Sequence, residues 1–211
     1  MVLKRGYELD EDEELFYDDP TLELFEEIYP IEEGYDALSR IYHHPEKGSL
    51  FVMYTQRVTQ AHIGKDLAHL FIAELTKNRA ERGIFITEQN LSLQAKQSLD
   101  SKGHFIQHFL HSELLVDVTI GQGVSEHELL SAEESKMYIK RMSEGLVGSS
   151  VVPSQMPKIF ISEAVGKTKS FSSDPQAKYL GALPGEVIRI TRINNYSETL
   201  VPAIIIHRIV Y

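Results

Sequence analysis

The chain has 211 residues, 25% of them charged and 42% hydrophobic, so it can form one large domain or two small ones with buried cores. No apolar run approaches the roughly 18 residues of a membrane-spanning helix, and the first residues lack the apolar core of a signal peptide. Because cysteine is absent, disulfides, thiolate metal sites and a cysteine nucleophile are excluded, which fits an intracellular protein.

The net charge of −10 is unevenly distributed along the chain. Residues 1–33 contain thirteen acids and two bases, whereas residues 158–211 contain seven bases and four acids. The acidic run from Glu8 to Glu14 predicts a solvated face or loop, with a specific acidic docking site as the alternative. A protein that holds DNA by itself normally has a basic face, so we expect any nucleic-acid role to be that of one part of a larger assembly.

The first half of the chain shows alternating strand and helix patterns. Apolar residues from Leu22 to Ile28 predict a short helix that ends before Pro30. The alternation that follows predicts a three-layer α/β/α domain over residues 1–124 with partly parallel strands. Its expected elements are strands at 48–54, 82–87 and 114–119, and helices at 67–77 and 91–99.

The second domain is expected over residues 125–211. Ser131 and Glu134 form a capping-box pattern that predicts a helix to about Met142. Further on, Asp174 and Pro175 have the order of a helix N-cap and first helical residue.

That short helix leads into a turn and a strand. Gly181 lies where a left-handed C-terminal cap is favoured, and Pro184-Gly185 has the order of a type II turn. Alternating residues from Val187 to Arg192 predict a strand.

These residues also resemble a known family. The string Asp-Pro-x-Ala-x-Tyr-Leu-Gly from Asp174, followed by Gly-Glu-Val-Ile-Arg-Ile-x-Arg from Gly185, resembles the assembly domain of the fifth common subunit of eukaryotic nuclear RNA polymerases, a domain that also forms the whole of one small archaeal polymerase subunit. Gly-Ser-Leu-Phe-Val at 48, Gly-Ile-Phe-Ile at 83 and Leu-Leu-Val-Asp-Val at 114 are similar to that family's jaw domain.

The resemblance implies a fold for each domain. It implies a jaw domain of restriction-endonuclease-like topology without the active site, and a small α+β assembly domain. Compared with the family pattern, this chain carries an inserted loop or small extra hairpin at about 160–173.

The resemblance also implies a function: a non-catalytic subunit of a multisubunit DNA-directed RNA polymerase, without cofactor, metal or membrane. It would dock on the largest subunit, contact other subunits and form part of the jaw beside downstream duplex DNA. The location would be the nucleus, or the virion or viral factory for a viral member. The implied docking residues are Tyr179, Leu180, Gly181, Gly185, Val187, Arg189 and Arg192, and the implied DNA-facing residues are Ser92, Gln94 and Lys96. The alternative is a free-standing scaffold or adaptor that binds a transcription factor.

Three other patterns could indicate a nucleotide site, a metal site or a nuclease active site, but each is better explained by ordinary structure. Gly166-Lys167-Thr168 resembles the end of a phosphate-binding loop, but Ile161 stands where its first glycine belongs. His104, His108 and His111 have helical spacing without a suitable acid, which predicts surface histidines on an amphipathic helix. A metal-dependent nuclease needs acid-x-Lys on a strand, and neither the residues after strand 82–87 nor Asp117-Val118-Thr119 supply it.

Overall fold

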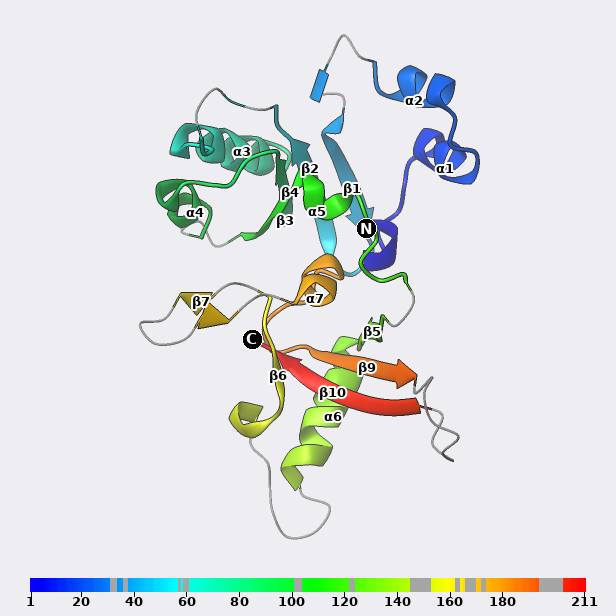
Figure 1. Cartoon of the computed structure of the whole chain (residues 1–211), viewed down its shortest axis with the longest axis vertical. Helices are drawn as coiled ribbons and strands as arrows, with labels where there is room; N and C mark the ends of the chain where they lie inside the picture. Colours follow the sequence, from blue (N-terminus) through cyan, green and yellow to red (C-terminus); the bar gives the residue numbers. More distant parts are fainter. Residues whose placement is uncertain are drawn as a thin grey trace. The chain divides into compact units, whose positions relative to one another are not determined.

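The computed structural model divides into two compact units, residues Val2–Val116 and Asp117–Tyr211, each with its own sheet (Figure 1). The expected boundary at 124/125 lies slightly later, just before β5 (Glu126–Leu129). No helix in the described part of the chain is long and apolar enough to cross a membrane. The structure describes residues 1–30, 34–35, 38–56, 58, 61–100, 104–121, 124–144, 153–161, 164–165, 170–171, 174–193 and 203–211, so the Gly166-Lys167-Thr168 pattern lies outside it.

The N-terminal unit contains a four-stranded sheet of order β1-β2-β3-β4. The first strand is antiparallel to the second, and the other three run parallel. The predicted strands at 48–54 and 82–87 are confirmed as the two central ones. The bounds are β1 Arg40–His44, β2 Gly48–Tyr54, β3 Arg82–Thr87 and β4 Phe105–Leu110.

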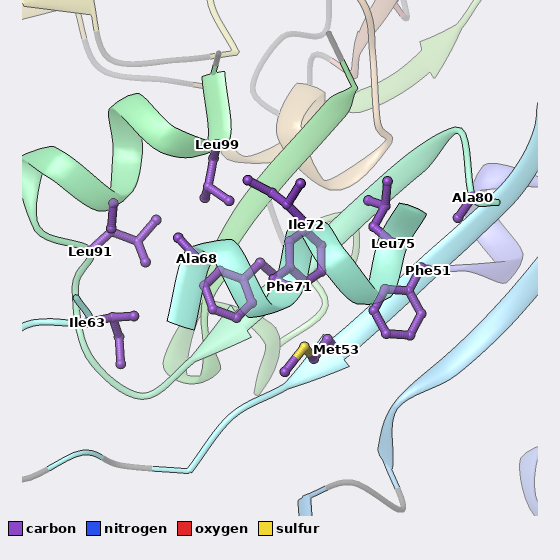
Figure 2. Close-up of a cluster of buried hydrophobic side chains, with 12 residues drawn as sticks. Phe51, Met53, Ile63, Ala68, Phe71, Ile72, Leu75, Ala80, Leu91 and Leu99 are labelled. Atoms are coloured by element: carbon purple, nitrogen blue, oxygen red, sulfur yellow. The ribbon is translucent and has the colours of Figure 1, made fainter. Parts of the chain in front are cut away.

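Helices α3 (Lys65–Lys77) and α4 (Leu93–Asp100) share one hydrophobic core with this sheet, as the apolar spacing predicted. Figure 2 shows Phe71 of α3 in this core, which also contains Phe51 and Phe85. The ring of Phe71 stacks on both, with centroid distances of 5.8 and 4.8 Å. Gly83 makes room for this packing, because a Cβ there would lie 2.5 Å from Leu75 Cδ1.

Side chains from the N-terminal segment lie against the opposite face of the sheet. This segment comprises η1 (Leu3–Arg5), α1 (Glu11–Asp18) and α2 (Leu22–Ile28), the last of which confirms the predicted helix. The Arg5 guanidinium lies 5.9 Å from the centre of the Phe109 ring on β4.

The acidic run is not simply a solvated face. Its residue Glu13 is buried at 6% exposure, and the Oε1 atom accepts hydrogen bonds from the hydroxyls of Tyr29 and Tyr42, each at 2.8 Å. Most of the other acids in the run are exposed. The prediction failed at Glu13 because charge density alone does not reveal which member of a helical acidic run faces the core.

The third strand of the parallel set lies elsewhere than predicted. It is β4, which contains His108, whereas residues 114–119 contain no strand and the helix α5 (His111–Leu114) ends at their first residue. A spacing of four places residues on one face of a helix and equally on one face of a strand, so the histidine pattern did not discriminate between them. In the 114–119 segment, Asp117 Oδ1 accepts from the Thr119 backbone N–H at 2.8 Å, a local turn that is incompatible with an extended run.

The C-terminal unit contains a four-stranded sheet of order β5-β9-β10-β6. Neighbours pair antiparallel except for β10 and β6, which are parallel. A small hairpin occupies part of the expected insertion. The bounds are β5 Glu126–Leu129, β6 Lys158–Ile159, β7 Ala164–Val165, β8 Ser170–Phe171, β9 Val187–Ile193 and β10 Ala203–Val210, with a 3-10 turn at Pro153–Gln155.

Each face of this sheet is partly covered. Helix α6 (Ala132–Glu144) lies against one face, where the Val187 backbone N–H donates to Ser135 Oγ at 3.3 Å. The Ser131–Glu134 capping box that begins this helix is confirmed, with reciprocal bonds of 3.2 and 3.0 Å. The other face carries a hydrophobic cluster that contains Ile159, Ala177, Ala182, Ile188, Ile190 and Val210.

Candidate functional site

The stretch from 174 to 192 begins with the helix that its sequence predicts. Asp174 Oδ1 accepts from the Ala177 backbone N–H at 2.9 Å, and α7 (Pro175–Tyr179) starts with proline in its first turn. Gly181 has a φ of +72° and follows the last helical turn. The next amide, Ala182 N–H, donates to the Ala177 carbonyl at 3.2 Å, which completes a left-handed glycine cap.

A tight turn then leads into β9. The Glu186 N–H donates to the Leu183 carbonyl at 3.1 Å, and Gly185 has a φ of +92°, as the third position of a type II turn requires. The Glu186 side chain also accepts from the Leu183 N–H at 2.7 Å. These bonds fix the direction in which β9 leaves the turn.

The seven expected docking residues divide by exposure. Tyr179 and Val187 are buried, at 6% and 0% exposure, and Gly181 is buried as well. Leu180 is partly buried, whereas Gly185 and Arg192 are exposed. The side chains of Tyr179 and Val187 therefore stabilise the domain itself.

Arg189 has a partner within its own domain. Its Nε donates to Glu128 Oε2 on the neighbouring strand β5 at 2.9 Å, and its Nη2 contacts the same oxygen. Both side chains are about half exposed, at 39% and 52%. Sequence reasoning missed this pair, although Glu126 and Glu128 alternate as strand residues that face one side.

A histidine lies beside this ion pair. His207 on β10 is in register with Arg189, and its ring stacks on Tyr138 of α6 with a centroid distance of 4.4 Å. Burial, and after it the nearby Arg189 charge, lower the pKa of His207 below the usual histidine value. The neutral ring is therefore the form that this packing favours.

The expected DNA-facing residues lie at the start of α4. Ser92 Oγ accepts from the Ala95 backbone N–H at 3.2 Å, so this hydroxyl caps the helix. Gln94 and Lys96 are exposed on the first turn. Of the three expected residues, these two are the ones that present their side chains to solvent.

Among the described residues of the N-terminal unit, the polar side chains near the sheet do not assemble a recognisable metal centre. His108 Nε2 lies 2.7 Å from Thr87 Oγ1, so it bridges β4 and β3. Glu88, just after β3, is exposed and accepts from the Tyr35 hydroxyl at 2.8 Å. Among the residues that the structure describes, no group of three or more histidine, aspartate or glutamate side chains could hold a metal ion.

Comparison with known proteins matches the C-terminal unit to a family. Residues 116–210 match the family described as RNA polymerase Rpb5, C-terminal domain. This match covers nearly all of the C-terminal unit, which is therefore similar in sequence to Rpb5 C-terminal domains. The match begins within one residue of the structural boundary at 116/117 and contains the whole stretch from Asp174 to Arg192.

Similarity to Rpb5-type proteins extends beyond that domain. The chain is 28% identical over 201 residues to the Caenorhabditis elegans protein named DNA-directed RNA polymerases I, II, and III subunit RPABC1, covering 91% of this chain and 83% of the relative. The namesake from Caenorhabditis briggsae is 28% identical over 200 residues with the same coverage. The Dictyostelium discoideum namesake is 32% identical over 124 residues, covering 56% of this chain and 54% of that protein. The resemblance found in the sequence is confirmed.

Proposed function

We propose that this chain is a non-catalytic subunit of a multisubunit DNA-directed RNA polymerase. The observation that carries the proposal is the match of residues 116–210, a self-contained structural unit, to the Rpb5 C-terminal domain. The similarity of most of the chain to proteins named as subunits of RNA polymerases I, II and III supports it. By this proposal the chain works in the nucleus of a cell, as part of a complex with other polymerase subunits.

The C-terminal domain is the part proposed to dock on the largest polymerase subunit. The N-cap of α7 and the turn at Gly185 fix the backbone that leads into β9. Near the end of that strand, Arg192 is exposed and can contact a partner. Arg189 is half exposed in its pair with Glu128 and can offer free guanidinium donors to a second acceptor. The buried Tyr179 and Val187 support this surface from within.

The N-terminal unit is proposed to form part of the jaw beside downstream duplex DNA. Its parallel strands β2, β3 and β4 with two packed helices are compatible with a restriction-endonuclease-like topology. Gln94 and Lys96 are exposed where they can reach a phosphate, and Ser92 orients their helix. Because the chain carries a net charge of −10, other subunits would supply most of the positive charge that DNA requires.

Purification of the tagged chain from its host tests this proposal. A polymerase subunit should co-purify in stoichiometric amounts with the two large catalytic subunits through a salt wash and size-exclusion chromatography. Recovery with a transcription factor but without the large subunits would contradict the proposal and would favour the adaptor alternative.

A further inference from the structure

Strand β10 leaves most of one edge without a strand partner in the described part of the chain. It pairs with β9 from Ala203 to Ile209, whereas it pairs with β6 only at Ile209 and Val210. Figure 1 shows β6 beside only the C-terminal end of this strand. We call the backbone of residues 203–207 on the side away from β9 the open edge.

A proline explains why β6 stops where it does. The Ile209 N–H donates to the Pro157 carbonyl at 2.9 Å, and the Tyr211 N–H donates to the Ile159 carbonyl at the same distance. In a continued parallel ladder, the residue at 157 would also donate its N–H toward the His207 carbonyl. Proline has no N–H, so the pairing ends there.

The pattern of backbone bonds identifies the groups that face outward. The Val210 N–H donates toward the β9 side, to the Glu186 carbonyl at 2.8 Å, whereas the Ile209 N–H points to the β6 side. Because directions alternate along a strand, the N–H and C=O groups of Ile205 and His207 point out of the open edge. They form a short row of donors and acceptors of the kind that another strand can pair with.

The side chains at the open edge are unusually apolar for an exposed strand. Ile204 is 51% exposed and Ile205 is 60% exposed, on opposite faces of the sheet. Natural proteins normally protect such edges with charges, proline or a covering segment, because an exposed apolar edge recruits other strands. An edge that combines unpaired backbone groups with exposed isoleucines has the chemistry of a β-augmentation site.

The charges around the open edge indicate what kind of strand fits. Arg208 is the next residue after the open edge, and Lys158 lies on β6 beside the C-terminal end of β10. Arg192 is exposed on β9 in register with Ile204. Arg208 donates from Nη1 to the Lys158 carbonyl at 3.2 Å, while its Nε is buried and has no acceptor among the described residues. An arriving carboxylate would supply an acceptor to this guanidinium.

The same charges disfavour a second copy of this chain as the occupant. Two copies paired edge to edge would bring two sets of these three cationic side chains together, and like charges in close apposition are unfavourable. An extended segment would pair with the unpaired backbone groups of the open edge. Apolar residues at its alternate positions would cover the isoleucines, and an acid near Arg208 would balance the positive charge.

We infer that the open edge of β10 binds an extended segment of a partner polymerase subunit, which adds a strand to the sheet of the C-terminal domain. This inference rests on the proposed function, because it assumes that the chain assembles into a polymerase. It assigns docking to a backbone edge that extends beyond the residues that the family resemblance implied.

Amide hydrogen exchange of the free chain and of the purified polymerase tests the inference directly. The amides of Ile205 and His207 should exchange rapidly in the free chain and become at least about tenfold slower in the complex, since each gains a backbone bond. The amides of Ile204 and Ile206 provide an internal control, because they already pair with β9 in the free chain. Unchanged exchange at 205 and 207 in an intact complex would overturn the edge inference and leave the subunit assignment standing.

A pair of variants separates the backbone from the side chain. Ile205→Pro removes an outward N–H without removing a donor to β9, whereas Ile205→Thr keeps the N–H and the β-branched shape. We expect Ile205→Pro to be incorporated at least about tenfold less well than wild type in competition, which corresponds to about 1.4 kcal/mol, and Ile205→Thr to be incorporated within about threefold. Equal incorporation of both variants would refute the inference.

Two further results have distinct meanings. If the wild-type chain does not co-purify with the large catalytic subunits, the proposed function fails and the inference fails with it. If the free chain forms concentration-dependent dimers that Ile205→Pro abolishes, a second copy is the occupant and the partner-strand inference is wrong. To keep misfolding from imitating lost docking, the far-UV circular dichroism spectrum and exchange at β9 must match wild type in both variants.

Discussion

Replacing Glu13 by alanine should destabilise the N-terminal unit by about 2–4 kcal/mol. The carboxylate is buried, and its Oε1 accepts from both Tyr29 and Tyr42 hydroxyls at 2.8 Å, so the variant leaves two tyrosines without their acceptor. Each hydrogen bond to a charged group contributes about 1.5–3 kcal/mol. The other oxygen, Oε2, is buried without a partner among the described residues, and removing it returns about 1–3 kcal/mol of desolvation cost.

The neighbouring acid supplies a matched control. Glu14 is exposed on the same helix, so Glu14→Ala should change the free energy of unfolding by less than about 0.5 kcal/mol. Amide exchange of β1 and α2 reports the stability of this unit separately from the rest of the chain. A double-mutant cycle with Tyr42→Phe should give a coupling energy of about 1 kcal/mol or more. Equal destabilisation by Glu13→Ala and Glu14→Ala would refute the reasoning.

Four other predictions concern ion pairs, pH and DNA. Arg189→Ala should lower the stability of the C-terminal domain by less than about 1 kcal/mol, because its pair with Glu128 is half exposed, yet weaken polymerase incorporation; equal incorporation in a competition pull-down would remove Arg189 from the docking surface. Burial, and then the Glu13 charge, raise the pKa of Tyr42, so the folded state holds the hydroxyl proton more tightly than the unfolded state does. The free energy of unfolding should therefore fall as pH rises above about 10. Denaturation of Tyr42→Phe at increasing pH should show a smaller fall. Burial, and then the Arg189 charge, lower the pKa of His207, so the C-terminal domain should lose stability as pH falls below about 6.5. In the His207→Phe variant, the stability of this domain should not depend on pH in that range. The isolated chain should neither cleave nor tightly bind duplex DNA at physiological salt, and magnesium-dependent cleavage abolished by one acid-to-alanine change would contradict this.

Sequence reasoning succeeded where a local rule determines the structure. The N-cap at Asp174, the left-handed glycine at Gly181 and the turn at Gly185 each depend on a few neighbouring residues whose chemistry permits one conformation. Strands β2 and β3 were found because their short apolar runs are bounded by turn residues. Those features also carried the family resemblance, so the proposed function rests on the same residues.

The failures came from contacts between residues distant in sequence. Nothing local marks Glu13 as the acid that two tyrosines, sixteen and twenty-nine positions away, would bury. The ion pair of Arg189 joins it to Glu128, sixty-one positions earlier.

Strand β4 was mistaken for a helix because apolar residues occur on both of its faces, Ile106 on one and Phe109 on the other. This removes the apolar–polar alternation that identifies a strand.

The packing of the C-terminal sheet constrains where a partner can bind. One face is covered by α6, where Ser135 bonds to the backbone of Val187, and the other carries the hydrophobic cluster around Ile188. A partner that displaced either layer would first have to expose a packed core, at a cost of several kcal/mol. Binding along an edge leaves both layers intact and satisfies backbone groups that no described strand pairs with. We therefore expect the edge that Pro157 leaves open on β10 to be a more favourable docking position than either face, even though the residues that carry the resemblance lie mostly inside the fold.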